Sequence, residues 1–396
     1  MAEEGRPTLK SWLVVACLGL VIFIFVTTSL MPMGLLPDIA AGIGRSEAFT
    51  GLLVTGYAWV AALLTLPLTM LAARFDRRSL LMAVLALFVL SHFLAWAASG
   101  FWSLFTARVL SAVAHAVLWG LATPTAVRLA PAGRSATVLA IMATGVSLAA
   151  IVGVPLGTWL GQQLGWRMAF LAVGLLAMAL MALLAVLLPS VKSDNLKPLK
   201  NLSLISGRPA LWRIYIVMLL STCGHAAAFT YFTPFMKTVA GVSPEGVVNY
   251  LLLFGLAGVA GSFLIGPLSS RYNPAATVAI LALMTVNLSA ASQLALSSAG
   301  IIVLCLLWGS LMSGVGILYQ SVLFKTAPEA TDLGMAIFAV FFNLGIGGGA
   351  LVGGRIFEHY SITAAFKGGA VFMAAALAVY LISIKIPARA ITSKPD

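Results

Sequence analysis

The sequence predicts an all-α membrane protein in which twelve transmembrane helices form two pseudo-symmetric six-helix halves. Three observations support this fold class. Hydrophobic residues make up 61% of the 396 residues and charged residues only 9%, whereas soluble domains contain roughly 25% charged residues. Apolar stretches of about 18 residues or more recur along the chain, and each could cross a hydrocarbon core of roughly 30 Å. Several short motifs also occur twice, at nearly the same spacing.

Each apolar stretch is expected to be a helix, because backbone amides in lipid must find hydrogen-bond partners within their own segment. The first stretch has the position of a signal peptide, but it is about 25 residues long and is followed by Pro37 and Asp38 rather than by a small-residue cleavage site. We therefore interpret it as the first span. The twelve expected spans cover residues 12–36, 49–73, 79–99, 101–127, 135–161, 167–188, 211–237, 244–270, 275–296, 300–324, 334–357 and 362–386.

The net charge of +12 might suggest a nucleic-acid partner, but the positions of the basic residues indicate membrane topology instead. With the N-terminus inside, 17 of the 23 lysines and arginines fall in the expected cytoplasmic segments, five fall on the opposite side and Arg108 lies within a span. This asymmetry follows the positive-inside rule. It predicts a multi-pass inner-membrane protein with both termini cytoplasmic, and it predicts no nucleic-acid partner.

A long polar break divides the chain. It runs from about residue 189 to 209 and contains several lysines and prolines. The predicted domains are therefore an N-terminal half at 1–188, a cytoplasmic linker at 189–209 and a C-terminal half at 210–396.

The two halves resemble each other. Gly153 and Gly157 recur 196 positions later as Gly349 and Gly353, and the basic turn after Arg128 recurs at an offset of 197. A repeated six-helix half is a recurring plan of secondary transporters, whose substrate site lies between the halves near the middle of the bilayer.

The strongest local motif lies at residues 145–170. Its glycines are spaced by four or eight residues, which places them on one helix face and allows neighbouring backbones to approach closely. Pro155 lacks a backbone donor and can bend the helix. The alternative interpretation is ordinary tight helix packing with no functional role. The glycines are Gly145, Gly153, Gly157, Gly161 and Gly165.

This stretch resembles the glycine–proline motif on helix five of the drug:proton antiporters of the major facilitator superfamily. Arg108 with His115 resembles the helix-four motif of the same antiporters. Residues 27–40 resemble the helix-one signature of the bacterial sugar-efflux branch, which includes arabinose and sugar exporters and some amphenicol exporters. The resemblance covers the whole chain and implies the major facilitator fold and a transport function.

The loop after the second span is a weak version of the superfamily's hallmark Gly-x-x-x-Asp-Arg-x-Gly-Arg-Arg. Arg74, Arg77 and Arg78 match its basic positions, whereas Ala73 replaces the aspartate and Asp76 replaces the second glycine. The charge network of the motif is therefore altered, although a basic turn between helices is kept.

A second departure concerns the proton carrier. Relatives usually have a glutamate after two threonines in helix one, where this chain has Ser29, and none of its eleven acidic residues falls near the middle of an expected span. A buried carboxylate is the usual carrier, because burial raises its pKa. Four explanations stay open: His115 or His225 replaces it, Asp38 reaches in from the helix end, coupling is weak, or position 29 has been altered.

Arg108 and two histidines are the main candidates for function. A bare cation within a span must find carbonyls, water or a substrate oxygen, so Arg108 has either a gating role or a structural role in holding helix one. His115 lies two turns from Arg108 on the same face, and His225 is the repeat mate of Thr28. Histidine can titrate near neutral pH and can bond a sugar hydroxyl, although a lone histidine can equally be a packing residue.

The remaining candidates are polar or amphipathic residues within spans, several of which could instead be interfacial belt residues. His92 is expected to be peripheral. The predicted substrate-binding residues are His115, His225, Thr28, Ser29, Tyr57, Trp119, Tyr231, Asn287 and Asn343. The predicted coupling or gating residues are Arg108, Asp38, Arg74, Arg77, Arg78, Gly153, Pro155 and Gly157.

The predicted function is secondary active export of sugars or similar small polar solutes by alternating access, coupled to protons. The expected partners are the solute, protons and the lipid bilayer, with a monomeric chain, no cofactor and no metal site. An amphenicol or multidrug exporter is the alternative within transport, and it would suit the many methionines and aromatic residues. A membrane enzyme or a receptor is the alternative of another class. The sequence contains no metal cluster, no nucleophile with a base and no P-loop lysine, which argues against an enzyme or a primary pump.

Overall fold

The computed structural model describes residues 9–72, 75–130, 133–189, 207–270, 274–327 and 331–385. These residues form helices joined by short turns and contain no strand. The all-α prediction is therefore confirmed. The predicted linker lies mostly outside the described residues, so the domain boundaries at 188 and 210 stay predictions.

The N-terminal half supplies six membrane-crossing units, some of them built from two or three consecutive helices. The units begin and end close to the expected spans. They comprise α1 Leu9–Gly34 with α2 Leu36–Ile43, α3 Glu47–Thr50 with α4 Leu52–Ala72, α5 Arg77–Trp96, α6 Phe101–Arg128, α7 Ser135–Leu148 with the π-helix η1 Ala149–Gly153 and α8 Val154–Leu164, and α9 Trp166–Leu187.

The C-terminal half repeats this plan. Its units are α11 Pro209–Phe229 with α12 Phe232–Thr238, α13 Pro244–Ser270, α14 Pro274–Ser289 with α15 Ala291–Leu294, α16 Ser298–Thr326, α17 Thr331–His359 and α18 Ile362–Lys385. Within the described ranges, eleven of the twelve units are helical and apolar over a membrane-spanning length. The exception is α14, at 16 residues, which is cut short by a turn at Ala290 and continued by α15.

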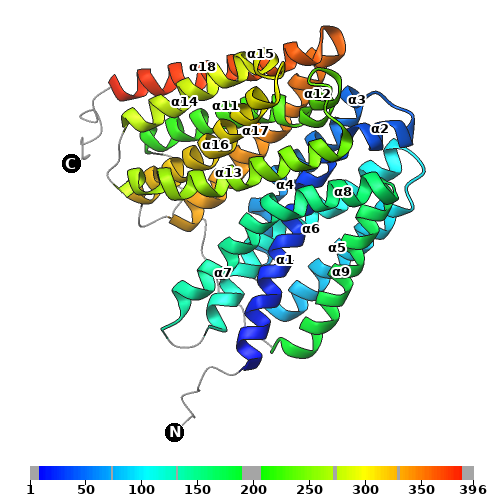
Figure 1. The fold of residues 1–396 in the computed structure, drawn as a ribbon. Coiled ribbons are helices and arrows are strands. Elements are labelled where there is room, and N and C mark those ends of the chain that lie inside the picture. The colour runs from blue at the N-terminus through cyan, green and yellow to red at the C-terminus, as the bar shows by residue number, and fades with distance from the viewer. Residues whose placement is uncertain are drawn as a thin grey trace, which may run out of the picture.

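The two halves form two helical bundles arranged as a V (Figure 1). We call the end where α1 begins and α18 ends the terminal end, and the opposite end, with α2, α3 and α12, the distal end. The bundles meet at the distal end, where α2 contacts α12 and α3 contacts α17, and they diverge toward the terminal end. Farther along, α4 packs against α17, and η1 and α8 pack against α13.

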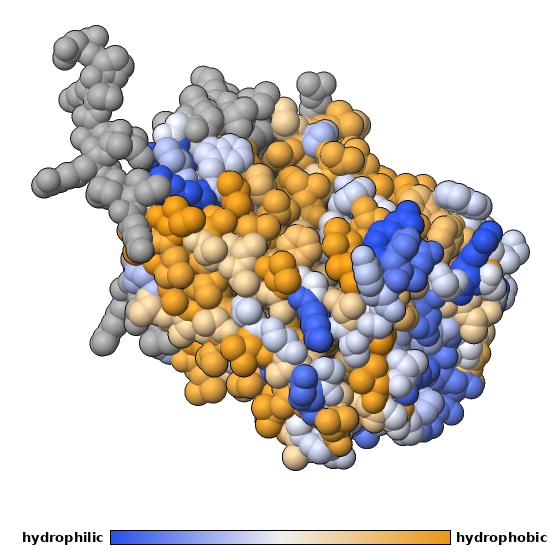
Figure 2. Space-filling view, turned by 90° about the horizontal axis from the view of Figure 1, so that it is seen from above, coloured by the Kyte–Doolittle hydropathy of each residue, from blue (hydrophilic) through white to orange (hydrophobic). Residues whose placement is uncertain are grey.

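Apolar side chains cover much of the outer surface. In Figure 2 hydrophobic residues occupy most of the face seen from above, and hydrophilic residues gather toward one side. Large residues such as Phe263, Leu264 and Val186 are each more than 70% exposed. An apolar surface of this extent requires a lipid environment, so the chain is a multi-pass membrane protein.

The glycines of the fifth span pack in register against α1. A Cβ atom on any of four glycines would collide with α1 or with the residue that follows it, and each colliding pair differs by 126 in residue number. Close backbone approach, as predicted, is therefore what these glycines provide. The pairs are Gly145 with Gly19, Gly153 with Thr27, Gly157 with Met31 and Gly161 with Leu35.

The fifth glycine was assigned wrongly to this face. Gly165 lies between α8 and α9 with a φ of 92°, so it forms the turn rather than a helix contact. A positive φ is a conformation that glycine adopts without steric cost.

The same packing recurs in the C-terminal half. Cβ atoms on Gly345, Gly349 and Gly353 of α17 would collide with the carbonyl oxygens of residues 219, 223 and 227 of α11. The residue numbers again differ by 126, so the sequence repeat extends to the way its helices pack.

Pro155 marks a change of helix geometry. It lies two residues after the last residue of η1, and a π-helical turn is one way in which a helix accommodates a missing backbone donor. Gly255 of α13 packs on this turn, because a Cβ atom there would lie 2.6 Å from the Ala150 carbonyl oxygen. The two halves therefore contact each other at the distorted turn.

The glycine contacts predict a site-specific loss of stability. Gly145→Ala should lower the Tm by several degrees, because its methyl group collides with the Gly19 backbone and overpacking costs about 1–3 kcal/mol. The matched change Gly316→Ala in α16 meets no atom within 4 Å and should leave the Tm unchanged or slightly raised. Thermal unfolding in detergent compares the two, and equal losses would contradict the packing argument.

Candidate functional site

Arg108 lies at the centre of the N-terminal half and is only 2% exposed. Its Nη1 donates a hydrogen bond of 2.8 Å to the carbonyl oxygen of Thr28. That carbonyl is available because the residue four positions later is Pro32, which has no N–H to complete the helical bond. Arg108 therefore satisfies a backbone acceptor that Pro32 leaves free in the C-terminal part of α1.

Thr28 is also held through its side chain. Its hydroxyl lies 2.9 Å from Nε2 of His92, whose Nδ1 lies 2.8 Å from the Phe88 carbonyl oxygen. A carbonyl only accepts, so Nδ1 carries the ring proton and Nε2 accepts from Thr28. His92 is 1% exposed, so the expectation that it is peripheral was wrong. An ionisable residue within an apolar span must turn toward the bundle interior, and this could have indicated its burial.

Arg108 also contacts Tyr57, one of the predicted substrate-binding residues. Its guanidinium carbon lies 4.2 Å from the ring centroid of Tyr57, a cation–π distance. Ser111 and His115 follow Arg108 by three and seven residues and share its helix face. Polar atoms of all four side chains are buried without a hydrogen-bond partner among the described residues: Arg108 Nε and Nη2, Tyr57 Oη, Ser111 Oγ and His115 Nδ1.

His115 is paired with Trp119, one helical turn away. The indole Nε1–H donates to His115 Nε2 over 2.7 Å. Because an indole N–H can only donate, the neutral His115 ring carries its proton on Nδ1. Trp119 is 41% exposed, so this pair reaches the surface of the N-terminal half.

A second histidine–tryptophan pair lies in the C-terminal half. Trp308 of α16 donates through Nε1 to His225 Nδ1 over 3.1 Å, which leaves the neutral His225 ring with its proton on Nε2. Trp308 is buried, and four phenylalanines surround it at edge-to-face angles with ring centroids 5.7–6.1 Å away. They are Phe229, Phe232, Phe254 and Phe366.

The distal end joins the halves through polar contacts. The Asp38 carboxylate in α2 lies 3.8 Å from Lys237 Nζ in α12. Thr55 of α4 donates to the Gly347 carbonyl over 3.1 Å, and Trp59 donates to the Leu344 carbonyl over 3.4 Å. Each of these bonds links the N-terminal half to the C-terminal half.

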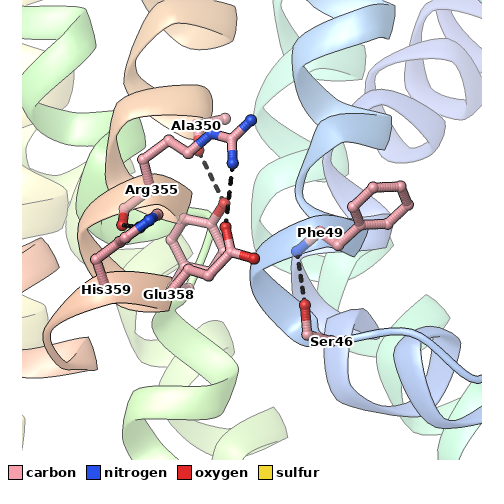
Figure 3. A network of polar contacts seen from close by, with 7 residues as sticks. Ser46, Phe49, Ala350, Arg355, Glu358 and His359 are labelled. Atoms are coloured by element: carbon pink, nitrogen blue, oxygen red, sulfur yellow. Dashed lines mark hydrogen bonds and ion pairs between the residues drawn. The ribbon is translucent and has the colours of Figure 1, made fainter.

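Tyr231 lies beside the contacts between the two halves at the distal end. Its hydroxyl donates to the Ala350 carbonyl over 2.8 Å and fills the space beside Gly51 and Gly354, where a Cβ atom would collide with it. Figure 3 shows the surroundings, with the ion pair of Arg355 and Glu358 on one side and the capped turn of α3 on the other.

At the terminal end the hallmark loop is only partly described. Asp76 accepts from the Ser79 N–H and caps α5, so the residue in the second glycine position starts a helix. Arg78 donates to the Ala185 carbonyl over 2.6 Å, and Arg77 is buried with its Nε and Nη1 unpartnered among the described residues. Arg74 lies outside the described residues.

With this geometry in place, a comparison with protein families gives one match, to the model of the Major Facilitator Superfamily over residues 16–332. The chain belongs to the Major Facilitator Superfamily. Its members and the structural neighbours below are transporters, not enzymes.

Solved structures of superfamily transporters share this fold at low sequence identity. The nucleoside transporter NupG superposes with a TM-score of 0.80 at 13% identity, covering 96% of this chain and 100% of that chain. A bacterial homologue of the human lysosomal transporter Spinster, in an inward-facing unoccupied conformation, gives 0.75 at 16% identity, with 96% and 98% covered. The human organic anion transporter MFSD10 gives 0.65 at 18% identity, with 94% and 100% covered.

The structure distributes the predicted substrate residues of this superfamily member over several places. Thr28, Tyr57 and His115 lie around Arg108, and Trp119 lies one turn beyond His115 on α6, whereas His225 belongs to the Trp308 cluster. Tyr231 lies at the distal end, where the halves meet. The Asn287 amide donates to the Leu304 carbonyl, the Asn343 amide to the Ala339 carbonyl, and the Ser29 hydroxyl to the Val26 carbonyl. Their binding roles stay predictions.

Proposed function

We propose that this superfamily member is a secondary active exporter of sugars or similar small polar solutes. The observation that carries the proposal is the pair of histidine–tryptophan couples, one in each half. Each couple fixes a neutral histidine with one ring N–H directed away from its tryptophan. Directed donors beside aromatic surfaces suit a ring-shaped ligand that carries hydroxyl oxygens.

Alternating access is supported by the shape of the molecule. The halves meet at the distal end and diverge at the terminal end (Figure 1). If the positive-inside distribution places the terminal end in the cytoplasm of a bacterium, this conformation faces inward and is ready to load a solute for export. The chain would act as a monomer, with both termini cytoplasmic.

Amphenicol or multidrug export is the second candidate. The cage of four phenylalanines around Trp308 favours it, because apolar aromatic ligands bind in such surroundings. Transport in everted membrane vesicles separates the candidates. In everted vesicles the cytoplasmic side faces the medium, so an exporter accumulates its substrate inside the vesicle. We expect a labelled sugar to accumulate and labelled chloramphenicol to stay outside. The reverse pattern would assign the second candidate, and accumulation of neither would leave a receptor role.

Proton coupling through the histidines is part of the proposal. A proton arriving at His115 Nε2 or at His225 Nδ1 would remove the acceptor of the indole N–H and so release Trp119 or Trp308. Protonation would thereby change the surface offered to the solute.

We therefore expect His115→Ala and His225→Ala to lower solute affinity or to flatten the pH dependence of export between about pH 5.5 and 8, around the ordinary histidine pKa of roughly 6.5. Everted vesicles with equal amounts of protein measure both effects. Trp119→Phe is the matched variant, because it keeps an aromatic side chain and removes the indole donor. Wild-type kinetics and pH profile in both histidine variants would refute this assignment.

A further inference from the structure

The region around Arg108 contains an uncompensated buried charge. Among the described residues only its Nη1 has an acceptor, while Nε and Nη2 have none. No carboxylate in the described part of the chain lies within ion-pair distance, since the aspartates and glutamates there all sit at helix ends. A buried cation without a counter-charge costs several kcal/mol.

The neighbouring unpartnered groups can all act as donors. The neutral His115 ring carries its proton on Nδ1, as its bond from Trp119 requires, and this Nδ1–H has no acceptor in the part of the chain that the structure describes. The hydroxyls of Tyr57 and Ser111 are also free to donate. Tyr57 is close to both Arg108 and His115: its ring centroid lies 4.2 Å from the Arg108 guanidinium carbon and 5.6 Å from the centroid of the His115 ring.

We propose that a small monovalent anion, of which chloride is the simplest, binds among Arg108, Tyr57, Ser111 and His115. A positive charge surrounded by donors and lacking an acceptor is the complement of an anion. The anion neutralises Arg108 within the helices α1, α4 and α6 and satisfies donors that are otherwise left unpaired. The site shares the His115 donor with the proposed solute site, so the inference adds to the proposed function, but its test requires no solute.

The test is thermal unfolding of the purified protein in detergent, without solute, as chloride replaces gluconate at constant pH, cation and ionic strength. Chloride should raise the Tm saturably, by about 3 °C, because a ligand that binds only the folded state stabilises it. Bromide and nitrate should act similarly. No saturable rise with any of these anions would overturn the proposal.

Two variants locate the site. Arg108→Gln keeps an N–H donor for the Thr28 carbonyl but removes the charge, so the chloride effect should disappear. Ser111→Ala removes one unpartnered hydroxyl. It should weaken chloride binding and so raise the midpoint chloride concentration about fivefold. If Arg108→Gln does not fold, Ser111→Ala decides. An unchanged chloride midpoint in the variants that fold would place the anion elsewhere and overturn the proposal.

Arg167 provides the matched control. It also donates to a backbone carbonyl, that of Ala98, and also lies 4.2 Å over an aromatic ring, that of Trp166. It differs in being only partly buried, with Nε and Nη2 both bonded. Arg167→Gln should keep the full chloride effect. Loss of the effect in this variant as well would mean that chloride acts through general charge, against the proposal.

A free anion and an acidic group on the solute are distinguished by the same assay. Stabilisation by chloride alone identifies an anion site that needs no solute. Stabilisation by acetate or benzoate but not by chloride would mean that the site takes a carboxylate and not a free inorganic anion, which would overturn the chloride assignment. Because no transport is measured, the result does not depend on the export assay.

Discussion

Gly51→Ala should slow transport roughly tenfold by opposing closure of the distal end. A methyl group at this position collides with the Tyr231 hydroxyl, which is itself fixed by its bond to the Ala350 carbonyl. Gly51 belongs to the N-terminal half and Tyr231 to the C-terminal half, so the clash arises only when the halves meet. Overpacking of about 1–3 kcal/mol applied to one of two states changes their ratio by roughly tenfold.

A second substitution should reverse part of this loss. Tyr231→Phe removes the oxygen atom that the new methyl group meets but leaves the ring carbon at 2.9 Å, so transport should recover in part in the double variant. Gly100→Ala is the control at the distal end, because a Cβ atom there meets nothing within 4 Å. Wild-type transport by Gly51→Ala, or an equal loss in Gly100→Ala, would show that the Tyr231 contact does not limit closure.

Arg108→Ala should abolish export and also destabilise the protein. It leaves the Thr28 carbonyl without a donor, and an unsatisfied buried acceptor costs about 1–3 kcal/mol. Adding Pro32→Ala supplies a backbone N–H four residues after Thr28, so the carbonyl regains a helical partner. The double variant should therefore recover stability but not transport.

This pair of variants separates the two roles considered for Arg108. If Arg108 only held α1 in place, the double variant would recover export together with its Tm. If Arg108 acts in gating or in anion binding, stability returns and export does not. Thermal unfolding and vesicle transport on the same preparations decide between the two.

The spans could be predicted from the sequence because an apolar segment in lipid must form a helix to satisfy its own backbone hydrogen bonds. The close packing of Gly145, Gly153 and Gly157 could also be predicted, since small residues at fourfold spacing serve few other purposes. The fold class required nothing beyond these local signals and the internal repeat.

The candidate site was harder, because a helix that is apolar on all sides does not show which face is turned inward. Trp102 and Trp308 are both tryptophans in or near apolar spans, yet Trp102 is 71% exposed and Trp308 is fully buried. His92 and Tyr231 acquire their partners from other helices, and no local pattern encodes those contacts. The role of Pro32 depends on Arg108 lying opposite Thr28, which only the packed bundle shows.

The central claim is that the two halves alternate between closure at the distal end and closure at the terminal end. Pulsed electron spin resonance in lipid nanodiscs can measure this with one spin-label pair at each end. Exposed sites are available for Arg45→Cys with Lys367→Cys at the distal end and for Arg134→Cys with Ala210→Cys at the terminal end. On adding the solute found in the vesicle assay, the account predicts a longer distal distance together with a shorter terminal distance. Distances that stay constant at both ends, or that change in the same direction, would contradict it.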